Sequence, residues 1–558
     1  MQSGLFIRSL RRVSPLRQTC RYSSTTTSNN AKPYYITTPI FYPNSVPHIG
    51  HLYTLVVADI FARYARIRHP GRPVTFIAGT DEHGMKIAKA AESKGMTPLA
   101  FCDMLSEHFK GLGQKANISS TKFSRTTSRE HCDAVQYLWR QLDAKGFIYK
   151  DSHSGWYSVS DECFYPQVQT TTVVDSAGKE QRISIESGST VEWQEEENYK
   201  FRLSEFQQVL EAHYARNADA IYPPQHHEAI LHQLRTAPLQ DLSVSRPSSR
   251  LSWGIPVPDD ETHTIYVWID ALTVYLSSIG FPWPNREKML ASGWPSDVQV
   301  IGKDILRFHA IYFPAMLAAL ELPFPQKLLA HSHWTMDHRK MSKSIGNVVD
   351  PIAAIDVYGI DIVRYYLAEI GGKFRDDVGE CLSGAAHLVH ITSLLGNLLS
   401  RSTSKAILAR VDLTRRLVYG EDPSLDGRPL VALLKALPAE MDAAMSELRV
   451  SDALTHIRAA LTAANVLMTE ARPWDKQTPP AEVQAVAQLV HDTLRICGVL
   501  LQPFMPSKAA TLLDALGVPE DCRKWEHTDV TRAPPCTGIQ SGVILFPKIK
   551  PTAPQPQN

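Results

Sequence analysis

The chain has 558 residues, of which 44% are apolar and 21% are charged. At about 150 residues per domain, this length predicts roughly three or four domains with ample buried core. The 58 Lys and Arg residues almost balance the 57 Asp and Glu residues, so the formal net charge is +1 and any nucleic-acid-binding surface must be local. No apolar run reaches about 18 residues, so no membrane span is predicted.

The first segment, residues 1–30, contains no Asp or Glu. Apolar residues recur there with a helical period, a Ser/Thr tract follows at 23–28, and five arginines are interspersed: Arg8, Arg11, Arg12, Arg17 and Arg21. This composition is typical of a mitochondrial transit peptide and predicts import into the mitochondrial matrix. A disordered basic tail that binds RNA is the alternative, but it would not need the helical period.

Two strand-like runs come next, Tyr34–Ile40 and Val74–Ala78, and each is followed by a loop and a helical pattern. Strands that alternate with helices predict a parallel sheet with ligands at the carboxyl ends of its strands. The alternation returns at Thr264–Val267, Val298–Ile301 and Leu328–Ala330. We therefore expect an α/β, Rossmann-like domain in two halves, 31–150 and 253–345.

Shorter β-like runs and a Ser/Thr/Gly-rich stretch occupy residues 151–252, which predicts an inserted connective domain. A linker is expected at 346–380. Amphipathic helical patterns at Leu388–Leu399, Ser451–Leu467 and Val483–Leu501 then predict an α-helical bundle over 381–547, with a short β-like end at Gly542–Phe546. The Pro-rich tail, 548–558, is expected to be disordered.

The first motif is His48-Ile49-Gly50-His51, at the point where a strand gives way to a helix. Backbone N–H groups and the helix dipole at such a point face an incoming phosphate. Gly50 permits close approach of a nucleotide, and the imidazoles of His48 and His51 can donate hydrogen bonds as charge builds in a transition state. Alone, the pattern is weak, because a histidine at a helix start is often only a cap.

The second motif is Lys340-Met341-Ser342-Lys343-Ser344, set after the last strand-like run. Two lysines three residues apart, with hydroxyl groups nearby, suit a loop that closes over a triphosphate and neutralises departing pyrophosphate. A lysine-rich loop is usually only solvated. The two motifs in this order around a split parallel sheet favour the functional interpretation.

With these motifs the sequence resembles the class I aminoacyl-tRNA synthetases, from about Lys32 to Lys548. Within the class it is similar to methionyl-tRNA synthetase, and the similarity is carried by longer blocks: Thr38–Asn44, Gly79–Gly84, Gly155–Glu162, Val267–Ala271 and Ile301–Asp304. The resemblance implies ATP as a substrate, with Mg²⁺ on its phosphates. It implies that ATP is bound by both motifs and by Gly302 and Asp304, with His48, His51, Lys340 and Lys343 as catalytic residues.

The resemblance also implies a methionine site. Trp268, Leu272 and Tyr275 share one face if their segment is helical, and polarizable or aliphatic walls suit a thioether. By resemblance, Asp81 pairs with the substrate ammonium, and the side-chain pocket is lined by Ile40, Tyr42, Trp268, Leu272, Tyr275, Ile305 and His309. Without the resemblance, an apolar stripe of this kind would be assigned to the core. Some relatives have Pro where this chain has Leu272.

In the expected bundle, Asn397 and Arg401 are four residues apart, and Trp474 follows Pro473. Amide, guanidinium and indole groups read and stack unpaired bases. By resemblance, these three residues recognise the anticodon of the methionine tRNA. A polar helix face and a partly buried staple are the ordinary interpretations.

The eight cysteines are scattered, and no two stand at Cys-x-x-Cys spacing. Some relatives carry Cys-rich zinc knuckles in the insert, but Cys163 has no partner at ligand spacing, so we expect no zinc. The expected partners are methionine and methionine tRNA, with no membrane, and the protein is expected to be a monomer. Two alternatives stay open: a class I synthetase for another amino acid such as cysteine, leucine or valine, and a non-catalytic tRNA-binding protein derived from a synthetase.

Overall fold

The structure is a computed structural model, and it describes residues 32–158, 163–165, 167–174, 178, 180–185, 187–336, 339–340, 349–374, 377, 391–532 and 538–547. The chain divides into residues 1–31 and a unit that starts at Lys32, and only the second unit is described below. The expected transit peptide, the expected disordered tail and residues 341–348, which include most of the Lys-Met-Ser-Lys-Ser motif, lie outside the described residues.

A parallel sheet of six strands forms the centre of the N-terminal part, in the order β3-β2-β1-β14-β15-β9. Strands from both sides of the expected insert meet at β1 and β14, where Ile36 lies opposite Val298. The predicted split parallel sheet is therefore confirmed. The strands are β1 (Tyr34–Phe41), β2 (Val74–Thr80), β3 (Lys122–Arg125), β9 (Ile221–Tyr222), β14 (Val298–Gly302) and β15 (Lys327–His331).

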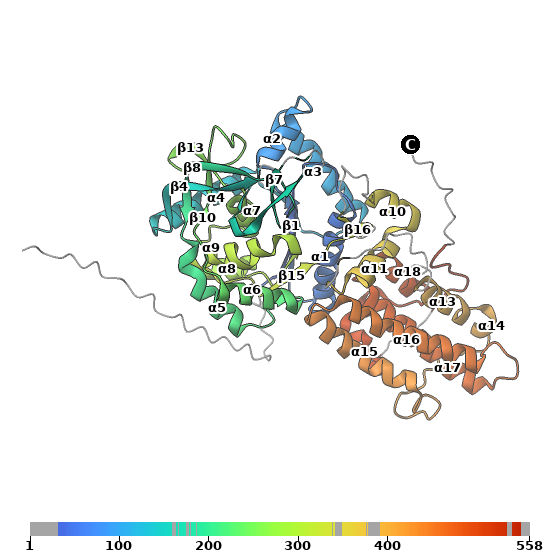
Figure 1. Ribbon diagram of the computed structural model, residues 1–558. Coiled ribbons are helices and arrows are strands. Elements are labelled where there is room, and N and C mark those ends of the chain that lie inside the picture. The colour runs from blue at the N-terminus through green and yellow to red at the C-terminus, as the bar shows by residue number, and fades with distance from the viewer. Residues whose placement is uncertain are drawn as a thin grey trace, which may run out of the picture. The chain divides into compact units, whose positions relative to one another are not determined.

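Helices pack along this sheet (Figure 1). Helix α1 (Ile49–Arg68) contacts β1, β2 and β14 and also the later helix α11, so almost every side of it is buried, including Leu52, Val56 and Ile60. That burial explains its nearly continuous apolar sequence, because a helix covered on all sides needs no polar stripe. Further helices of this N-terminal part are α2 (Met85–Glu92), α3 (Pro98–Lys115), α4 (Arg129–Ala144), α7 (Val267–Ser277), α8 (Arg286–Ser292) and α9 (Phe313–Ala319).

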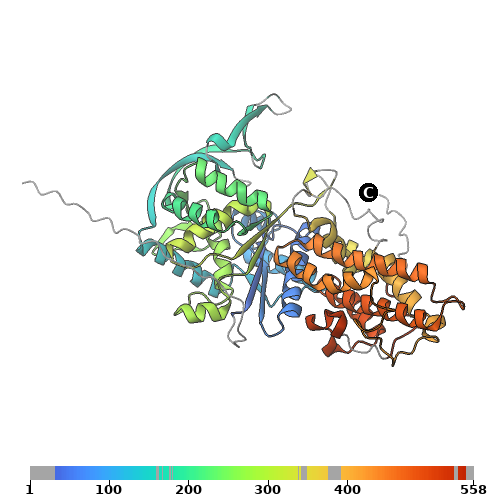
Figure 2. The same ribbon diagram turned by 90° about the horizontal axis from the view of Figure 1, so that it is seen from below.

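The region expected as an insert contains a four-stranded antiparallel sheet, in the order β10-β8-β4-β5, and a separate hairpin, β6-β7. Figure 2 shows this hairpin, in teal, extending away from the other strands. One short strand of the region, β9, instead pairs with β15 in the parallel sheet. The elements are β4 (Ile148–Ser158), β5 (Cys163–Tyr165), β6 (Thr170–Val174), β7 (Glu180–Ser184), β8 (Glu192–Phe201), α5 (Gln207–Arg216), α6 (Pro224–Thr236) and β10 (Leu242–Ser243).

The prediction of a sheet strand at Thr264–Val267 is wrong. Strand β13 (Asp260–Ile265) ends before this run does, and it belongs to a small antiparallel sheet with β11 (Ser245–Pro247) and β12 (Pro256–Val257). Helix α7 begins at Val267. A short apolar run of this kind suits a buried strand and a buried helix equally, so its periodicity could not decide between them.

The C-terminal part is helical, as predicted. Its helices are α10 (Pro351–Tyr358), α11 (Ile360–Gly371), α13 (Asn397–Ser402), α14 (Lys405–Leu408), α15 (Pro429–Ser446), α16 (Val450–Ala471), α17 (Pro480–Leu501) and α18 (Pro506–Ala515). The expected linker therefore carries two helices, α10 and α11. The expected β-like end is wrong, because residues 542–546 form no strand and Leu545 is instead buried in the helical core.

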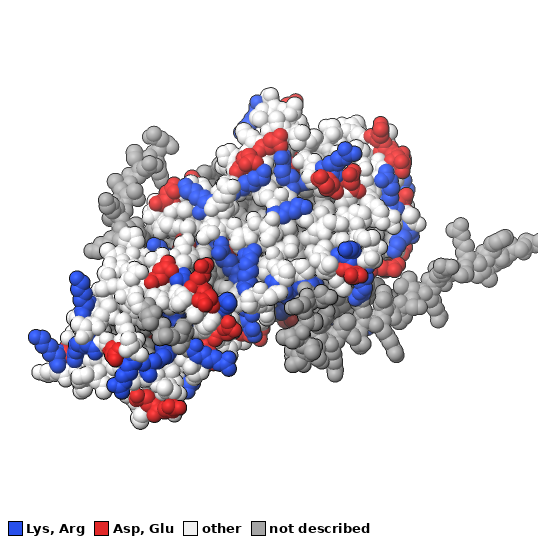
Figure 3. All heavy atoms as spheres, turned by 180° about the vertical axis from the view of Figure 1, so that it is seen from behind, with Lys and Arg blue, Asp and Glu red and all other residues white. Residues whose placement is uncertain are grey.

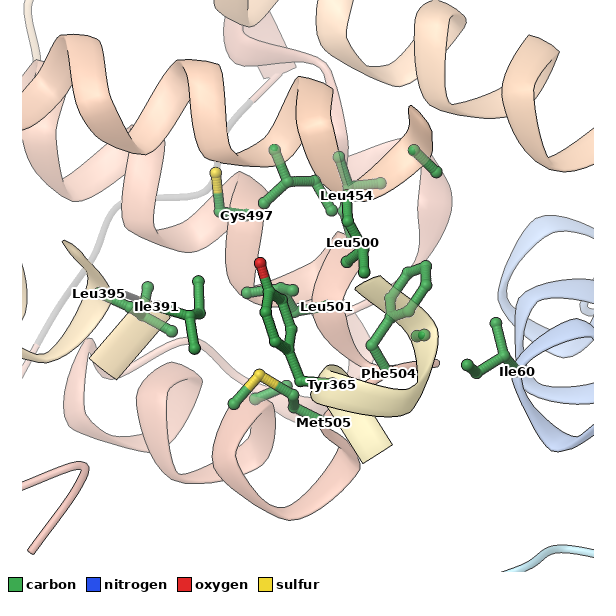
Figure 4. Close-up of a cluster of buried hydrophobic side chains, with 14 of the residues drawn as sticks. Ile60, Tyr365, Ile391, Leu395, Leu454, Cys497, Leu500, Leu501, Phe504 and Met505 are labelled. Carbon is green, nitrogen blue, oxygen red and sulfur yellow. The ribbon is translucent and has the colours of Figure 1, made fainter. Parts of the chain in front are cut away.

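One hydrophobic cluster runs from the sheet into the helical part. Figure 4 shows Ile60 of α1 in it together with Tyr365, Leu500 and Phe504. Among the described residues, no helix is long and apolar enough to cross a membrane. Figure 3 shows that basic and acidic side chains both occur on one face of the molecule.

Candidate active site

The first motif forms the N-terminus of α1. His48 is the N-cap residue, and its Nδ1 accepts a hydrogen bond of 3.1 Å from the backbone N–H of Gly50. His51 Nδ1 in turn accepts from the backbone N–H of His48 at 3.0 Å, and the two rings stack with centroids 3.8 Å apart. In each ring Nδ1 is an acceptor, so Nε2 carries the proton of the neutral imidazole and can donate to an oxygen.

Gly50 fits tightly in this reciprocal cap. A Cβ atom there would lie 2.9 Å from Cε1 of His48, so any larger residue would push the ring aside. This local reason for glycine is separate from the expected close approach of a nucleotide to Gly50, which stays a prediction. The cap and the carbonyl of Val349 pair the backbone N–H groups of Gly50 and Ile49, so an anion at this end would meet the helix dipole rather than free backbone donors.

The turn after β2 brings Asp81, Glu82 and His83 to the carboxyl end of the sheet. The backbone N–H of Asp81 donates to the carbonyl of Phe41 at 2.8 Å, which ties this turn to the end of β1. Glu82 is fully buried, and its carboxylate accepts from Thr80 Oγ1 at 2.6 Å and from Arg125 Nε at 2.7 Å. The buried carboxylate of Glu82, paired with Arg125, therefore fixes the turn that holds Asp81.

A second buried carboxylate joins this turn to α7. Asp270 lies 2.6 Å from Nδ1 of His83 and 2.7 Å from Nε2 of His131. Burial alone would raise the pKa of Asp270, but the charge and hydrogen bonds of the two histidines outweigh it and lower that pKa. The network connects the turn after β2, helix α4 and helix α7.

Tyr275, His309 and Ile305 form a hydrogen-bonded chain. Tyr275 Oη lies 2.7 Å from Nε2 of His309, and Nδ1 of His309 lies 2.9 Å from the carbonyl oxygen of Ile305. A carbonyl can only accept, so the proton lies on Nδ1 and Tyr275 donates to Nε2. Burial lowers the pKa of His309 to about 4, which keeps the imidazole neutral at physiological pH.

Around this chain the structure brings together most of the predicted pocket residues. Trp268, Leu272 and Tyr275 lie on α7, and Ile40, Leu272, Tyr275 and Ile305 belong to one apolar cluster. His309 joins them through its hydrogen bond with Tyr275. Asp81 is near enough that its charge, after burial, contributes to raising the pKa of Tyr275. Tyr42 packs elsewhere, against a cluster between α2 and α3 that includes Trp253.

Gly302 and Asp304 lie where β14 ends. A Cβ on Gly302 would be 2.6 Å from Oδ1 of Asp304, so a larger residue at position 302 would displace the Asp304 carboxylate. Asp304 Oδ1 lies 3.7 Å from Nε2 of His333. Lys340 lies in β17 (Arg339–Lys340), which pairs with β16 (Thr335–Met336), while the positions of Met341, Ser342, Lys343 and Ser344 are outside the described residues.

In the helical part, Arg401 and Trp474 are brought together. The Arg401 guanidinium carbon lies 5.0 Å from the centre of the Trp474 ring, and 42% of Trp474 is exposed. Asn397 is exposed at the start of α13, one helical turn before Arg401. These three residues come from α13 and from the connection between α16 and α17.

Comparison with known proteins decides the family. Residues 34–403 match the family described as "tRNA synthetases class I (M)", and residues 420–554 match the "Anticodon binding domain of methionyl tRNA ligase". The chain belongs to the class I methionyl-tRNA synthetases.

Individual relatives agree with this assignment. The chain is 42% identical over 512 residues, 91% of this chain and 94% of the relative, to the probable mitochondrial methionine–tRNA ligase of Schizosaccharomyces pombe. It is 41% identical over 506 residues, 87% of this chain and 84% of the relative, to the mitochondrial methionine–tRNA ligase of Homo sapiens. Its structure resembles that of Mycobacterium tuberculosis methionyl-tRNA synthetase in complex with methionyl-adenylate, with a TM-score of 0.84 and 35% sequence identity. The match covers 93% of this chain and 100% of the Mycobacterium tuberculosis chain.

Several residues of the synthetase site were missed by sequence reasoning. Phe308 stacks on Trp268 with ring centroids 3.5 Å apart, and it lies in a π-helical turn, η4 (Phe308–Tyr312). The His83–Asp270–His131 network and the Arg125–Glu82 pair were also not predicted. No sequence signal marks these pairs, because their members are 187, 139 and 43 residues apart. The π-turn, a geometry often found at functional sites, has no reliable sequence pattern either.

A cavity of about 180 Å³ adjoins the synthetase site at Val267, the first residue of α7. Tyrosine rings, apolar groups and cations line it: Met85, Lys89, Tyr157, Arg246, Arg250, Leu251, Tyr266 and Val267. None of the residues predicted to bind methionine is among them. Rings and cations of this kind are the groups that hold unpaired nucleotides.

Within the part of the synthetase that the structure describes, no three His, Cys, Asp or Glu side chains gather as they would around a metal ion. The side chain of Cys163 is outside that part. The absence of zinc therefore stays a prediction.

Proposed function

We propose that the chain is a methionine–tRNA ligase that activates methionine with ATP and then transfers it to the 3′-terminal adenosine of methionine tRNA. The observation that carries this proposal is the hydrogen-bonded series Tyr275–His309–Ile305, together with Asp81 at the carboxyl end of β1, whose charge acts on Tyr275. A neutral polar group and apolar walls suit a thioether, and a nearby carboxylate suits an ammonium.

In the first step, an oxygen of the methionine carboxylate attacks the α-phosphorus of ATP in line. A new P–O bond forms, the bond to the β-phosphate oxygen breaks, and pyrophosphate leaves with the electron pair. The reaction needs no protein nucleophile, so catalysis rests on positioning and charge stabilisation. We assign hydrogen-bond donation to His48 and His51 and charge neutralisation to Lys340 and Lys343.

ATP arrives with Mg²⁺ on its phosphates, so the ion is part of the substrate. The ion reduces the negative charge of the triphosphate. The tight turn at Gly302 and the carboxylate of Asp304 lie at the end of β14, where ligands of parallel sheets bind, and this position supports their assignment to ATP. Met341, Ser342 and Ser344 are assigned to the same site by resemblance.

Methionine recognition is divided between its two ends. The carboxylate of Asp81 is proposed to pair with the substrate ammonium. Trp268, Leu272, Tyr275 and His309 are proposed to hold the thioether, with Ile40 and Ile305 completing the wall. Tyr42 is assigned to the pocket by resemblance alone, because its ring packs against the cluster between α2 and α3. Burial lowers the pKa of His309 to about 4 and so keeps it neutral, and Ile305 and Tyr275 fix its tautomer, so this residue places no charge in the proposed thioether pocket.

In the second step, a hydroxyl of the tRNA terminal adenosine attacks the carbonyl carbon of methionyl-adenylate and AMP leaves. The class I resemblance places the new ester on the 2′ oxygen. The cavity at Val267, with Lys89 and Arg250 at its lining, is suited to the unpaired end of the tRNA. Asn397, Arg401 and Trp474 are proposed to recognise the anticodon.

The site of action is proposed to be the mitochondrial matrix. The relatives from Schizosaccharomyces pombe and Homo sapiens are named mitochondrial, and residues 1–30 have the composition of a transit peptide. We propose that the enzyme works there as a monomer.

The test of the function is ATP–pyrophosphate exchange measured with each amino acid in turn. Exchange should depend on methionine and should be far weaker with cysteine, leucine or valine. Stronger exchange with any of these would replace the substrate assignment. No exchange with any amino acid, in a protein that still binds tRNA, would favour the non-catalytic alternative.

A further inference from the structure

The connection between α16 and α17 presents Trp474 to solvent. Helix α16 ends at Ala471, and the chain reverses at Arg472. Arg472 has a left-handed backbone conformation (φ 45°), which residues other than glycine rarely adopt. Pro473 is buried, while 42% of Trp474 is exposed. A large apolar ring in this position, on an unfavourable turn, needs an external support to hold one orientation.

Arg410 supplies that support from just beyond the end of α14. Its Nη1 donates to the carbonyl oxygens of Pro473, at 2.8 Å, and of Asp475, at 2.6 Å. Its Nη2 donates to the carbonyl of Thr478 at 2.6 Å. One planar guanidinium therefore binds three main-chain carbonyls, on both sides of Trp474.

Trp474 is at the same time held against Arg401, whose guanidinium carbon lies 5.0 Å from the centre of the ring. Arg401 also donates from Nη2 to Thr469 Oγ1 of α16 at 3.3 Å. Arg410 thus holds the backbone on both sides of Trp474, and Arg401 contacts the face of the Trp474 ring. A stacking platform that is ordered before binding loses less entropy when a base stacks on it.

We propose that Arg410 is a positioning residue for tRNA recognition, which holds the 473–478 turn so that Trp474 is oriented beside Arg401 before the tRNA binds. This inference rests on the proposed recognition of the anticodon by Trp474. Arg410 touches the turn through main-chain carbonyls, so its effect on tRNA is transmitted by Trp474. A lysine cannot replace it, because one ammonium cannot span three carbonyls in a fixed plane.

The first experiment compares Arg410→Ala, Arg410→Lys and the control Lys405→Ala. Lys405 is exposed on neighbouring α14, so the control removes the same charge without touching the turn. Both Arg410 variants should lower kcat/KM for charging methionine tRNA roughly tenfold, within the range for loss of one base-stacking contact. Pyrophosphate exchange should stay within about twofold of wild type, and the control should change neither rate.

The second experiment is a double-mutant cycle with Trp474→Ala. Arg410→Ala should reduce charging in the wild-type background but by less than about twofold in the Trp474→Ala background, since the two residues act as one unit. An equal fractional loss in both backgrounds would overturn the inference, because Arg410 would then act on the tRNA or on the fold independently of Trp474. If Arg410→Ala folds poorly, Arg410→Gln serves in the same cycle.

The cycle also separates this inference from the proposed function. If Trp474→Ala itself leaves charging unchanged, the anticodon assignment fails and Arg410 loses its role with it. If Trp474→Ala lowers charging while the Arg410 variants do not, the anticodon assignment stands and only the positioning role is refuted.

Discussion

Replacement of Tyr275 by Phe is a direct test of the methionine pocket, because it removes one oxygen and leaves the shape of the ring. That oxygen lies 2.7 Å from Nε2 of His309. Tyr275 and His309 are only 2% and 3% exposed, so water cannot replace the lost donor. An unpaired buried polar group costs about 1–3 kcal/mol, and this sets the expected loss of unfolding free energy.

The same loss should affect methionine binding. Without the Tyr275 hydroxyl the imidazole of His309 is held only by Ile305, so its position against the thioether must be fixed again when methionine binds. If the whole cost of about 1–3 kcal/mol fell on binding, the KM for methionine in pyrophosphate exchange would rise roughly 5- to 150-fold. The KM for ATP should stay near wild type.

Tyr35→Phe is the matched control. The hydroxyl of Tyr35 donates to the backbone carbonyl of Tyr275 at 2.8 Å, and Tyr35 is fully buried in the same cluster, outside the predicted pocket. Urea denaturation should show a loss of stability in both variants, whereas only Tyr275→Phe should raise the KM for methionine. Equal stability losses with an unchanged KM in both would mean that Tyr275 and His309 are ordinary core residues.

Three further predictions concern other parts of the site. Lys343→Ala should lower kcat for adenylate formation at least tenfold with little change in the KM for methionine, because its charge is assigned to the transition state; wild-type activation by the variant would remove that role. Elemental analysis of the purified protein should find no stoichiometric zinc, and one zinc per chain would show that scattered ligands assemble a site. For His309, burial lowers the pKa from 6.5 to about 4, so as pH falls from 6.5 towards 4 the unfolded chain binds a proton that the folded chain does not, and stability is lost. At pH 5.5 this loss of unfolding free energy is about 1.4 kcal/mol. Between pH 7.5 and 5.5, the unfolding free energy measured by urea denaturation should therefore fall less in His309→Gln than in wild type, and an equal fall would contradict the lowered pKa of His309.

The elements that could be predicted are those whose pattern is local and long. Periodic apolar residues predicted Ser451–Leu467, and α16 is Val450–Ala471; they predicted Val483–Leu501, and α17 is Pro480–Leu501. The strand–loop–helix pattern likewise placed the His48–His51 motif where a strand gives way to a helix, and α1 begins at Ile49, because a helix start is specified within a few positions.

Features that depend on distant partners could not be predicted. Thr264–Val267 was assigned to the parallel sheet because apolar runs do not reveal which strand they will pair with, and the two-residue strand β9 is too short to leave a pattern. The pairing of Asp270 with His131 joins residues 139 positions apart, so only the fold determines it. The pocket residues were identified by resemblance, since their own apolar pattern is that of any buried helix face.

The two ends of α1 explain how one buried helix serves both parts of the enzyme. It begins at the His48 cap, and near its other end Tyr64 and Arg68 bind the carboxylate of Asp442 on α15. Between them, Asp59 is fully buried and paired with Arg364 of α11 at 2.7 Å. Burial opposes ionisation of Asp59, yet the charges of Arg364 and Arg63 outweigh it and lower the pKa of Asp59, so this ion pair persists at physiological pH.

Trp474 lies outside this rigid connection. Helix α16 has 22 residues and is therefore roughly 33 Å long. Its start is fixed to the end of α11, where the backbone N–H of Ser451 donates to the carbonyl of Gly372 at 3.3 Å, and Trp474 follows its opposite end. A change of side chain at Trp474 therefore alters neither the α1 cap nor the buried pair of Asp59 and Arg364. Its effect on charging must be transmitted by the bound tRNA itself, which is the physical reason why base-reading variants should lower charging and spare pyrophosphate exchange.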